Sequence, residues 1–389
     1  MKIDAKHLET SESVRKLQSS LQAKAKTEPS YRFYSLWDKV CRRDFLAEAY
    51  QRCRRNGGSA GVDAETFERI ELAGREAWLG KLQEELRTKQ YRAQPLLRVW
   101  IPKSNGGQRP LGIPTVRDRV VQMAMVMVLG PIFEADLCDE QMGFRPGRDA
   151  KTAVRLVYYQ VRQKGRQEVV DADLSDYFNT VPHGALMKSL SRRIADGQVL
   201  AVIARWLEVP VEERTSDGRT VRSTPAKDAG RGTPQGGVIS PLLANVYFRR
   251  FVLAWKQLGH EKAFDSVIVN YADDFVICCR PGKGVEARKA MTRVMERIGL
   301  KVNEQKTKVV LVPGEFFPLT PLRANSSSNA SRCSTGVRTR PSTSVFNTLS
   351  GTVVFVIPYM LRRIRPAQIE VLAVTLTPYH RQISMTPPA

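Results

Sequence analysis

Two short apolar runs, at residues 266–270 and 275–279, flank a polar break in the second half of the chain. Runs of β-branched and aromatic residues on both sides of such a break predict a β-hairpin. The break is Tyr271-Ala272-Asp273-Asp274, so the predicted turn carries two adjacent carboxylates. Asp is common in turns, but carboxylate oxygens are also ligands for hard divalent cations such as Mg²⁺. The pattern alone therefore fits both a polar turn and a cation site.

Apolar periodicity predicts further elements in the first part of the chain. The polar, charged segment 1–30 fits a loosely held helix. Helical spacing is expected at 31–55, 73–86 and 118–137, and the last of these is apolar on more than one face, which predicts that it is buried. The run 99–102 and its return at 111–114 predict a hairpin with a polar tip that contains Lys103 and Arg109.

The second half continues this alternation. We expect a strand at 168–174, helical structure from Val181, a polar connection at 220–233, a helix at 285–298 that ends at Gly299, and a strand-like unit at 300–312. Ser240-Pro241 marks another helix start, because Ser is a favoured N-cap and Pro in the first helical position loses no needed N–H.

Composition narrows the class of protein. The chain has 389 residues and a formal net charge of +22, with the cations spread along the sequence rather than in one tail. Such a charge favours polyanionic partners, and a broad nucleic-acid groove fits it well. Six cysteines without a C-x-x-C pair and only four histidines argue against a zinc site. Because no apolar segment is long enough for a signal peptide or a membrane span, we expect a reduced, cytoplasmic protein without a membrane partner.

The composition changes at about residue 313. Residues 313–389 contain no Lys and no Asp, are rich in Ser and Thr, and lack a sustained helical or strand period. One interpretation is a disordered segment. The interpretation that we favour is a shifted reading frame, and it would be tested by sequencing the locus for an intact alternative frame.

A two-metal site needs a third carboxylate beside Asp273 and Asp274. Asp173 ends the strand predicted at 168–174, and two metal ions can activate a 3′ hydroxyl and hold the leaving pyrophosphate. Asp171 lies two residues earlier and points to the same side of that strand. On geometry alone, Asp171 is a rival to Asp173.

The chain resembles the reverse transcriptases encoded by group II introns. Six blocks carry the resemblance in the family's order: 109–114, 143–148, 171–178, 231–241, 271–274 and 299–308. Gly61-Val62-Asp63 is also similar to the family's N-terminal extension, and the resemblance covers roughly residues 31–312. It implies Asp173 rather than Asp171 as the catalytic acid, because the family's Asp precedes an aliphatic residue and, five positions on, an aromatic one.

The resemblance assigns roles to individual residues. Asp173, Asp273 and Asp274 would be the catalytic acids and the ligands of two Mg²⁺ ions. Lys103 and Arg109 would grip the triphosphate, Gln235 and Gly236 would line the nucleotide pocket, and Phe178 would exclude a ribose 2′-hydroxyl, with Tyr177 as the alternative gate. Arg145, Arg148 and Lys306 would contact nucleic acid.

The implied fold is an α+β right-hand polymerase core with an antiparallel palm sheet that has helices on one face. The expected segments are an N-terminal extension at 1–95, fingers at 96–165, a palm at 166–312 and an atypical tail at 313–389, with the family's thumb not recognisable. The implied activity is RNA-directed DNA synthesis from dNTPs on an RNA template with a DNA primer. The implied partners are the intron RNA, whose splicing the protein would assist as a maturase, and a target DNA.

Three alternatives stay open from the sequence. The first is a related bacterial reverse transcriptase with another role, although the N-terminal extension argues against it. The second is a non-enzymatic maturase remnant that only binds intron RNA. The third is an inactive fragment. The sequence does not predict the oligomeric state.

Overall fold

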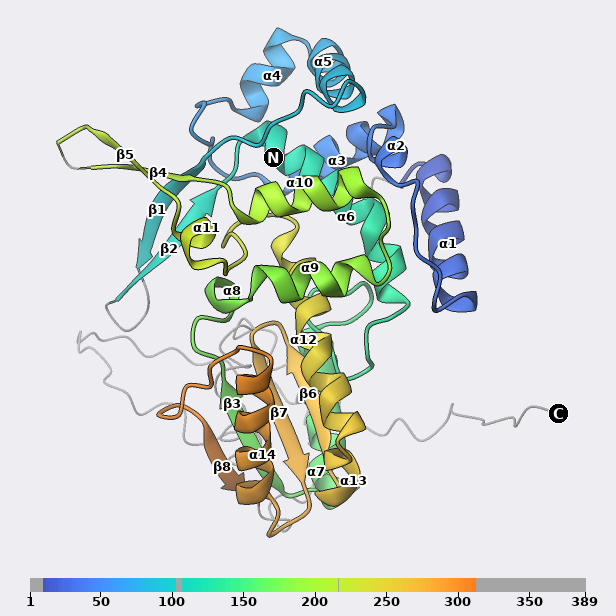
Figure 1. The fold of residues 1–389 in the computed structure, drawn as a ribbon, viewed down its shortest axis with the longest axis vertical. Coiled ribbons are helices and arrows are strands. Elements are labelled where there is room, and N and C mark those ends of the chain that lie inside the picture. The colour runs from blue at the N-terminus through green and yellow to red at the C-terminus, as the bar shows by residue number, and fades with distance from the viewer. Residues whose placement is uncertain (1–9, 103–106, 216, 313–389) are drawn as a thin grey trace, which may run out of the picture.

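The computed structural model describes residues 10–102, 107–215 and 217–312, which form two four-stranded sheets joined and covered by helices. The predicted α+β class is confirmed (Figure 1). The predicted features of the tail at 313–389 lie outside the described residues, as do those of Lys103.

Up to residue 162 the described chain is helical apart from one β-hairpin, which is formed by β1 and β2. In chain order the described elements are α1 (Glu12–Thr27), α2 (Trp37–Val40), α3 (Arg43–Asn56), α4 (Phe67–Ala73), α5 (Arg75–Arg87), β1 (Leu96–Pro102), β2 (Gln108–Ile113), α6 (Val116–Glu134) and α7 (Ala150–Arg162).

The elements after residue 162 hold the remaining strands. They are β3 (Glu168–Asp173), α8 (Tyr177–Thr180), α9 (His183–Ser191), α10 (Gly197–Leu207), β4 (Val211–Arg214), β5 (Thr220–Ser223), α11 (Pro225–Ala229), α12 (Ser240–Gln257), α13 (His260–Ala263), β6 (Val267–Tyr271), β7 (Asp274–Cys279), α14 (Gly284–Arg297) and β8 (Lys308–Leu311).

The first sheet has the strand order β2-β1-β4-β5. The predicted hairpin at 99–114 forms its β1–β2 pair, with Pro102 opposite Gln108. β4 joins β1 in a short parallel pairing, and β5 returns antiparallel to β4. The segment 220–233, expected to be only a polar connection, therefore contains β5 and α11. β5 pairs with the preceding strand β4, which is itself held in the sheet by the distant strand β1.

The second sheet, with the order β6-β7-β3-β8, is antiparallel throughout, as predicted for a palm sheet. The expected β6–β7 hairpin is confirmed, with Tyr271 opposite Asp274. The expectation of helices on one face only is wrong. α12 and α14 cover one face, whereas α7 packs on the other through Val154 and Val157 (Figure 1). Every residue of β7 is buried, as a strand covered on both faces requires.

Two N-terminal expectations are corrected. α1 is not loosely held, because Val14, Leu21 and Ala25 are buried on its inner side against the main core. The predicted helix 31–55 is divided into α2 and α3, and Phe33 instead forms a bridge to Ile194. The long helix α6 is buried on several sides, as its apolar pattern predicted.

Helix α12 begins at Ser240 as expected, but for a different reason. Its N-cap is Ile239, and the Ser240 hydroxyl donates to the carbonyl of Pro234 at 2.7 Å instead of capping the helix. This bond ties the start of α12 to the preceding Gly-rich loop. At the end of α14, Gly299 has a φ of 77°, which agrees with the predicted helix stop.

Within the described ranges, we find no helix with the length and apolar character that a bilayer crossing requires.

Candidate active site

The Asp273 turn is held by Asn270 of its own hairpin and by the chain at Gly143. Asn270 is fully buried, and its side-chain amide donates to the carbonyls of Ala272 and Asp274 at 2.9 and 3.1 Å. Ala272 has a φ of 61°, a left-handed conformation that costs a non-Gly residue roughly 1–2 kcal/mol. The turn therefore keeps its shape because its surroundings impose it.

Gly143 provides the closest of these contacts. A Cβ on Gly143 would lie 2.1 Å from the backbone nitrogen of Ala272, so only glycine allows this approach. The carbonyl of Gly143 accepts a bond from the Asn245 amide at 2.7 Å, and the N–H of Met142 donates to Asn270 at 2.8 Å. The blocks 143–148, 231–241 and 271–274 are thus linked, the second of them through α12.

Asp173 and Asp274 stand directly opposite each other on β3 and β7. Asp274 is buried, and the side chain of Asp173 is 19% exposed. Like charges opposite each other in an antiparallel pair destabilise a sheet. The amine of Lys306 lies 3.4 Å from Asp173 Oδ2 and offsets part of this repulsion.

A central cleft of about 590 Å³ opens beside these carboxylates. Its lining brings together eight of the residues to which the sequence assigned a role: Arg109, Asp173, Tyr177, Phe178, Gln235, Gly236, Asp273 and Lys306. Asp176 and Asn303, which the sequence did not indicate, also line the cleft, whereas Asp274 does not. The site is therefore assembled from β2, β3, α8, the loop before α12, the β6–β7 turn and the loop before β8.

Neighbouring groups orient the predicted nucleotide-facing residues. The Gln235 amide donates to Asp176 at 3.2 Å, and the N–H of Gly112 donates to the Gln235 carbonyl at 2.8 Å. Gly236 has a φ of 105°, and a Cβ there would lie 2.5 Å from the carbonyl oxygen of Gly112. This glycine allows the loop to lie directly against β2.

Asp173 is held at its backbone by the segment 299–308. The N–H of Asn303 donates to the Asp173 carbonyl at 2.8 Å, and the N–H of Asp173 donates to the Thr307 hydroxyl at 3.3 Å. The rival Asp171 is not among the residues that line the central cleft. Burial and the charge of Asp173 raise the pKa of Asp171 to about 6.

The two aromatic candidates differ in their surroundings. Tyr177 is buried, and its hydroxyl donates to the carbonyl of Ala244 at 2.7 Å. Burial raises the pKa of the Tyr177 phenol, and the nearby Asp273 carboxylate adds to that rise. Phe178 is half-buried at the cleft and packs beside Tyr177, with ring centroids 5.8 Å apart.

The predicted nucleic-acid contacts have different outcomes. Arg145 is buried and bonds to the Glu134 carboxylate and to the carbonyls of Cys138 and Gln141, so its predicted contact with template or primer is wrong. Its guanidinium is used in holding the chain before Gly143. Arg148 remains at the surface in an ion pair with Asp139, and its nucleic-acid contact stays a prediction.

The oxygen donors of this site suit a hard cation. Asp173 and Asp274 face each other directly on the neighbouring strands β3 and β7. Asp273 lines the central cleft together with Asp173. A cation would relieve their repulsion, and Lys306 can move aside because its side chain is 56% exposed. Among the described residues, no group of three acidic, His or Cys side chains is arranged to hold a metal ion by itself. Mg²⁺ is commonly bound by one or two carboxylates together with substrate phosphates, and the facing carboxylates of Asp173 and Asp274 fit that requirement.

The two sheets and the central cleft between them define a polymerase fingers-and-palm core. The sequence profile of "Reverse transcriptase (RNA-dependent DNA polymerase)" matches residues 101–375, and the chain belongs to this family. The match extends into the segment after residue 312 that composition set apart.

Curated relatives agree with this assignment. Protein YkfC of Escherichia coli is 34% identical over 78% of this chain and 86% of its own length. The group II intron-encoded protein LtrA of Lactococcus lactis is 28% identical over 72% of this chain, which spans only 43% of LtrA. The predicted resemblance to group II intron-encoded proteins is confirmed. A solved telomerase from Candida albicans is 15% identical and covers 60% of this chain and 45% of its own, with a TM-score of 0.42, which is a partial likeness only.

Proposed function

We propose that this protein catalyses RNA-directed DNA synthesis in the central cleft. The 3′ oxygen of a DNA primer attacks the α-phosphorus of a dNTP, and the bond to pyrophosphate breaks as the new phosphodiester forms. The hydroxyl proton leaves to solvent. The observation that carries this proposal is the cleft itself, in which Asp173, Asp273, Gln235 and Arg109 meet in a chain of the reverse transcriptase family.

Asp173, Asp273 and Asp274 would hold two Mg²⁺ ions. Such ions supply Lewis acidity for the attacking hydroxyl and charge neutralisation for the leaving pyrophosphate. The chain's own residues position the reactants, which is most of what phosphoryl transfer requires. Lys306 would hold the side chain of Asp173 in place until the metal ions and the substrate bind.

Arg109 would bind the triphosphate, because its exposed guanidinium lies on β2 at the rim of the cleft and can contact phosphate oxygens bidentately. Gln235 and Gly236 would form the wall for the incoming nucleotide. Lys103 is proposed for the same triphosphate from the sequence resemblance. Phe178 would exclude a ribonucleotide, since its ring lines the cleft beside Asp173.

The Phe178 proposal predicts altered sugar selectivity. Phe178→Ala would open space for a 2′-hydroxyl and raise the ratio of rNTP to dNTP incorporation by about 10- to 100-fold, because a steric contact at this scale is worth about 1–3 kcal/mol. The measurement is kcat/KM for each nucleotide in single-nucleotide primer extension. Tyr177→Phe serves as the control, since it removes only the buried hydroxyl and should leave the ratio unchanged. An unchanged ratio in Phe178→Ala would remove Phe178 as the gate.

We further propose that the intron RNA and a target DNA are partners and that the chain assists splicing. Support for this role comes from the names of similar proteins, since LtrA and a COX1/OXI3 intron 1 protein are both named for introns. The formal charge of +22 supports binding to a polyanion. Binding should weaken steeply with salt, because each phosphate contact releases counterions.

Primer extension on an RNA template tests the proposed activity. Wild-type protein should extend an annealed DNA primer with dNTPs, and Asp273→Ala should not. If both proteins fail to extend while both retain RNA binding in a filter assay, the non-enzymatic maturase alternative replaces the polymerase proposal. If neither protein extends or binds, the inactive-fragment alternative is favoured.

A further inference from the structure

A second cleft lies away from the carboxylates, between α9, α12 and the end of α6. Its volume is about 480 Å³, and it shares no lining residue with the central cleft. Four guanidiniums and one carboxylate line it: Arg192, Arg193, Arg249, Arg250 and Asp136. We refer to it as the arginine cleft. Its composition is unusual because burying like charges together is costly unless a counter-charge is supplied.

Two of the four arginines are part of the internal structure. Arg193 is buried, donates to the carbonyls of Ala25 and Glu28 at 2.7 and 2.9 Å, and pairs with Asp136 at 3.2 Å. Arg249 donates to the Asp136 carbonyl at 2.6 Å. The only carboxylate among the lining residues is therefore already engaged by Arg193.

The other two arginines are not balanced within the cleft. Arg192 is exposed at the end of α9. Arg250 is half-buried on α12, and its Nη1 makes one long bond of 3.3 Å to the Ser189 hydroxyl. The Nε of Arg250 is buried without a hydrogen-bond partner among the described residues. A buried donor of this kind destabilises the protein unless a partner binds it.

The walls of the arginine cleft strengthen its field. Phe133, Leu137, Val246 and Leu253 contribute apolar surface around the guanidiniums. Clefts that are lined by one sign of charge and have low-dielectric walls focus the electrostatic potential. Guanidinium groups bind phosphate oxygens bidentately, which makes phosphate the anion that this cleft suits best.

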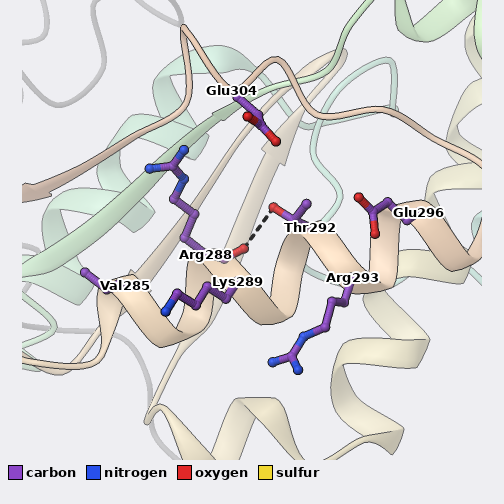
Figure 2. A pocket seen from close by; sticks show the side chains of 7 residues that line it. All are labelled: Val285, Arg288, Lys289, Thr292, Arg293, Glu296 and Glu304. Atoms are coloured by element: carbon purple, nitrogen blue, oxygen red, sulfur yellow. Dashed lines mark hydrogen bonds between the residues drawn. The ribbon is translucent and has the colours of Figure 1, made fainter.

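A cavity on α14 provides the contrast. Figure 2 shows Arg288, Lys289 and Arg293 projecting from α14, with Glu296 on the same helix and Glu304 across the cavity. Its cations are thus accompanied by two carboxylates. The cavity, of about 630 Å³, therefore has a weaker net positive charge than the arginine cleft. The α14 surface is suitable as a control for general electrostatic attraction.

We propose that the arginine cleft binds backbone phosphates of an RNA strand at a site separate from the central cleft. The volume is in the range of pockets that take ligands larger than a single phosphate. Arg192 and Arg250 come from different helices, so they can contact different phosphates of one strand. This inference depends on the proposed function in one respect, namely that RNA is the polyanion that the protein binds.

The test compares two double variants of the full chain that lose the same charge. R192Q/R250Q empties the arginine cleft of its two unbalanced cations, and R288Q/K289Q removes two cations from α14. Binding of a labelled RNA without a primer is measured by fluorescence anisotropy across a salt series. We expect R192Q/R250Q to raise the Kd about tenfold and to lower the slope of log K against log salt by about one to two, as loss of two phosphate contacts predicts. R288Q/K289Q should change the Kd by less than about threefold, the scale of general attraction between exposed charges.

Equal weakening in the two double variants, or no weakening in R192Q/R250Q, would overturn the proposal. The variant R192K/R250K separates loss of charge from damage to the structure. It should keep most of the salt dependence of the wild type, whereas damage to the α9–α12 packing would reduce RNA affinity in R192K/R250K as well as in R192Q/R250Q.

Binding of inorganic tripolyphosphate is the second measurement. If it binds the wild type and not R192Q/R250Q while RNA affinity is unchanged, the site takes a free polyphosphate and the RNA proposal is wrong. Absence of primer extension would affect only the proposed function, since this assay uses no primer.

Discussion

We expect Asp173→Asn to lose at least about 10³-fold in the rate of nucleotide incorporation, because removal of a metal-holding carboxylate costs several kcal/mol of transition-state stabilisation. The same variant should be more stable than the wild type in metal-free buffer. Asp173 stands opposite the buried Asp274, and neutralising it removes a like-charge pair worth about 0.5–1 kcal/mol. The lost contact with Lys306 is worth less, since that lysine is 56% exposed and exposed ion pairs contribute little.

Asp171→Asn is the matched control for this prediction. Asp171 is on the same face of β3, two residues away, but does not line the central cleft. Its substitution should change incorporation by less than about threefold, which is under 1 kcal/mol. The measurements are single-turnover primer extension and urea unfolding of each purified variant. Equal loss of activity in Asp171→Asn and Asp173→Asn would contradict the assignment of Asp173 as the third acid.

The second large effect concerns Gly143, which does not line the central cleft. Gly143→Ala should lower the free energy of unfolding by about 3 kcal/mol, because the new Cβ would lie 2.1 Å from the backbone nitrogen of Ala272 and neither backbone can move easily. Any protein that still folds should have a displaced Asp273 and little incorporation. Urea denaturation and primer extension measure the two effects.

Gly184→Ala provides the comparison for that variant. Gly184 lies on α9, and a Cβ there would meet no atom within 4 Å. The substitution should stabilise the protein by roughly 0.4–1 kcal/mol, since Ala has fewer conformations to lose from the unfolded chain and fits the backbone at this position. If Gly143→Ala were as stable and active as Gly184→Ala, the rigid contact between the 143–148 block and the Asp273 turn would not exist.

The local pattern of apolar and polar residues was sufficient to predict the strands that hold Asp173, Asp273 and Asp274. The β6–β7 hairpin and β3 could be predicted, because both depend on short apolar runs and a turn that are contiguous in sequence. The sequence placed both Asp171 and Asp173 near the hairpin, and only the family resemblance favoured Asp173, because the register that puts Asp173 opposite Asp274 joins distant segments.

The errors arose where long-range packing decides. The second covered face of the β3–β7 sheet was missed, although the continuous apolar run 275–279 is typical of a strand buried on both sides. Arg145 was assigned to nucleic acid because its partner Glu134, on α6, cannot be recognised from the sequence. Asn270 was missed as well, because a buried amide that holds a turn has no sequence signature.

The dependence of incorporation on Mg²⁺ tests most directly whether the three carboxylates form a polymerase site. A preassembled RNA template and DNA primer would receive one dNTP, with protein freed of metal and then titrated with Mg²⁺. We expect no product in chelator, a saturable return of activity with Mg²⁺ in the wild type, and no return in Asp273→Asn. Product formation in chelator, or the same titration in Asp273→Asn as in the wild type, would contradict a metal-dependent polymerase site at Asp173, Asp273 and Asp274.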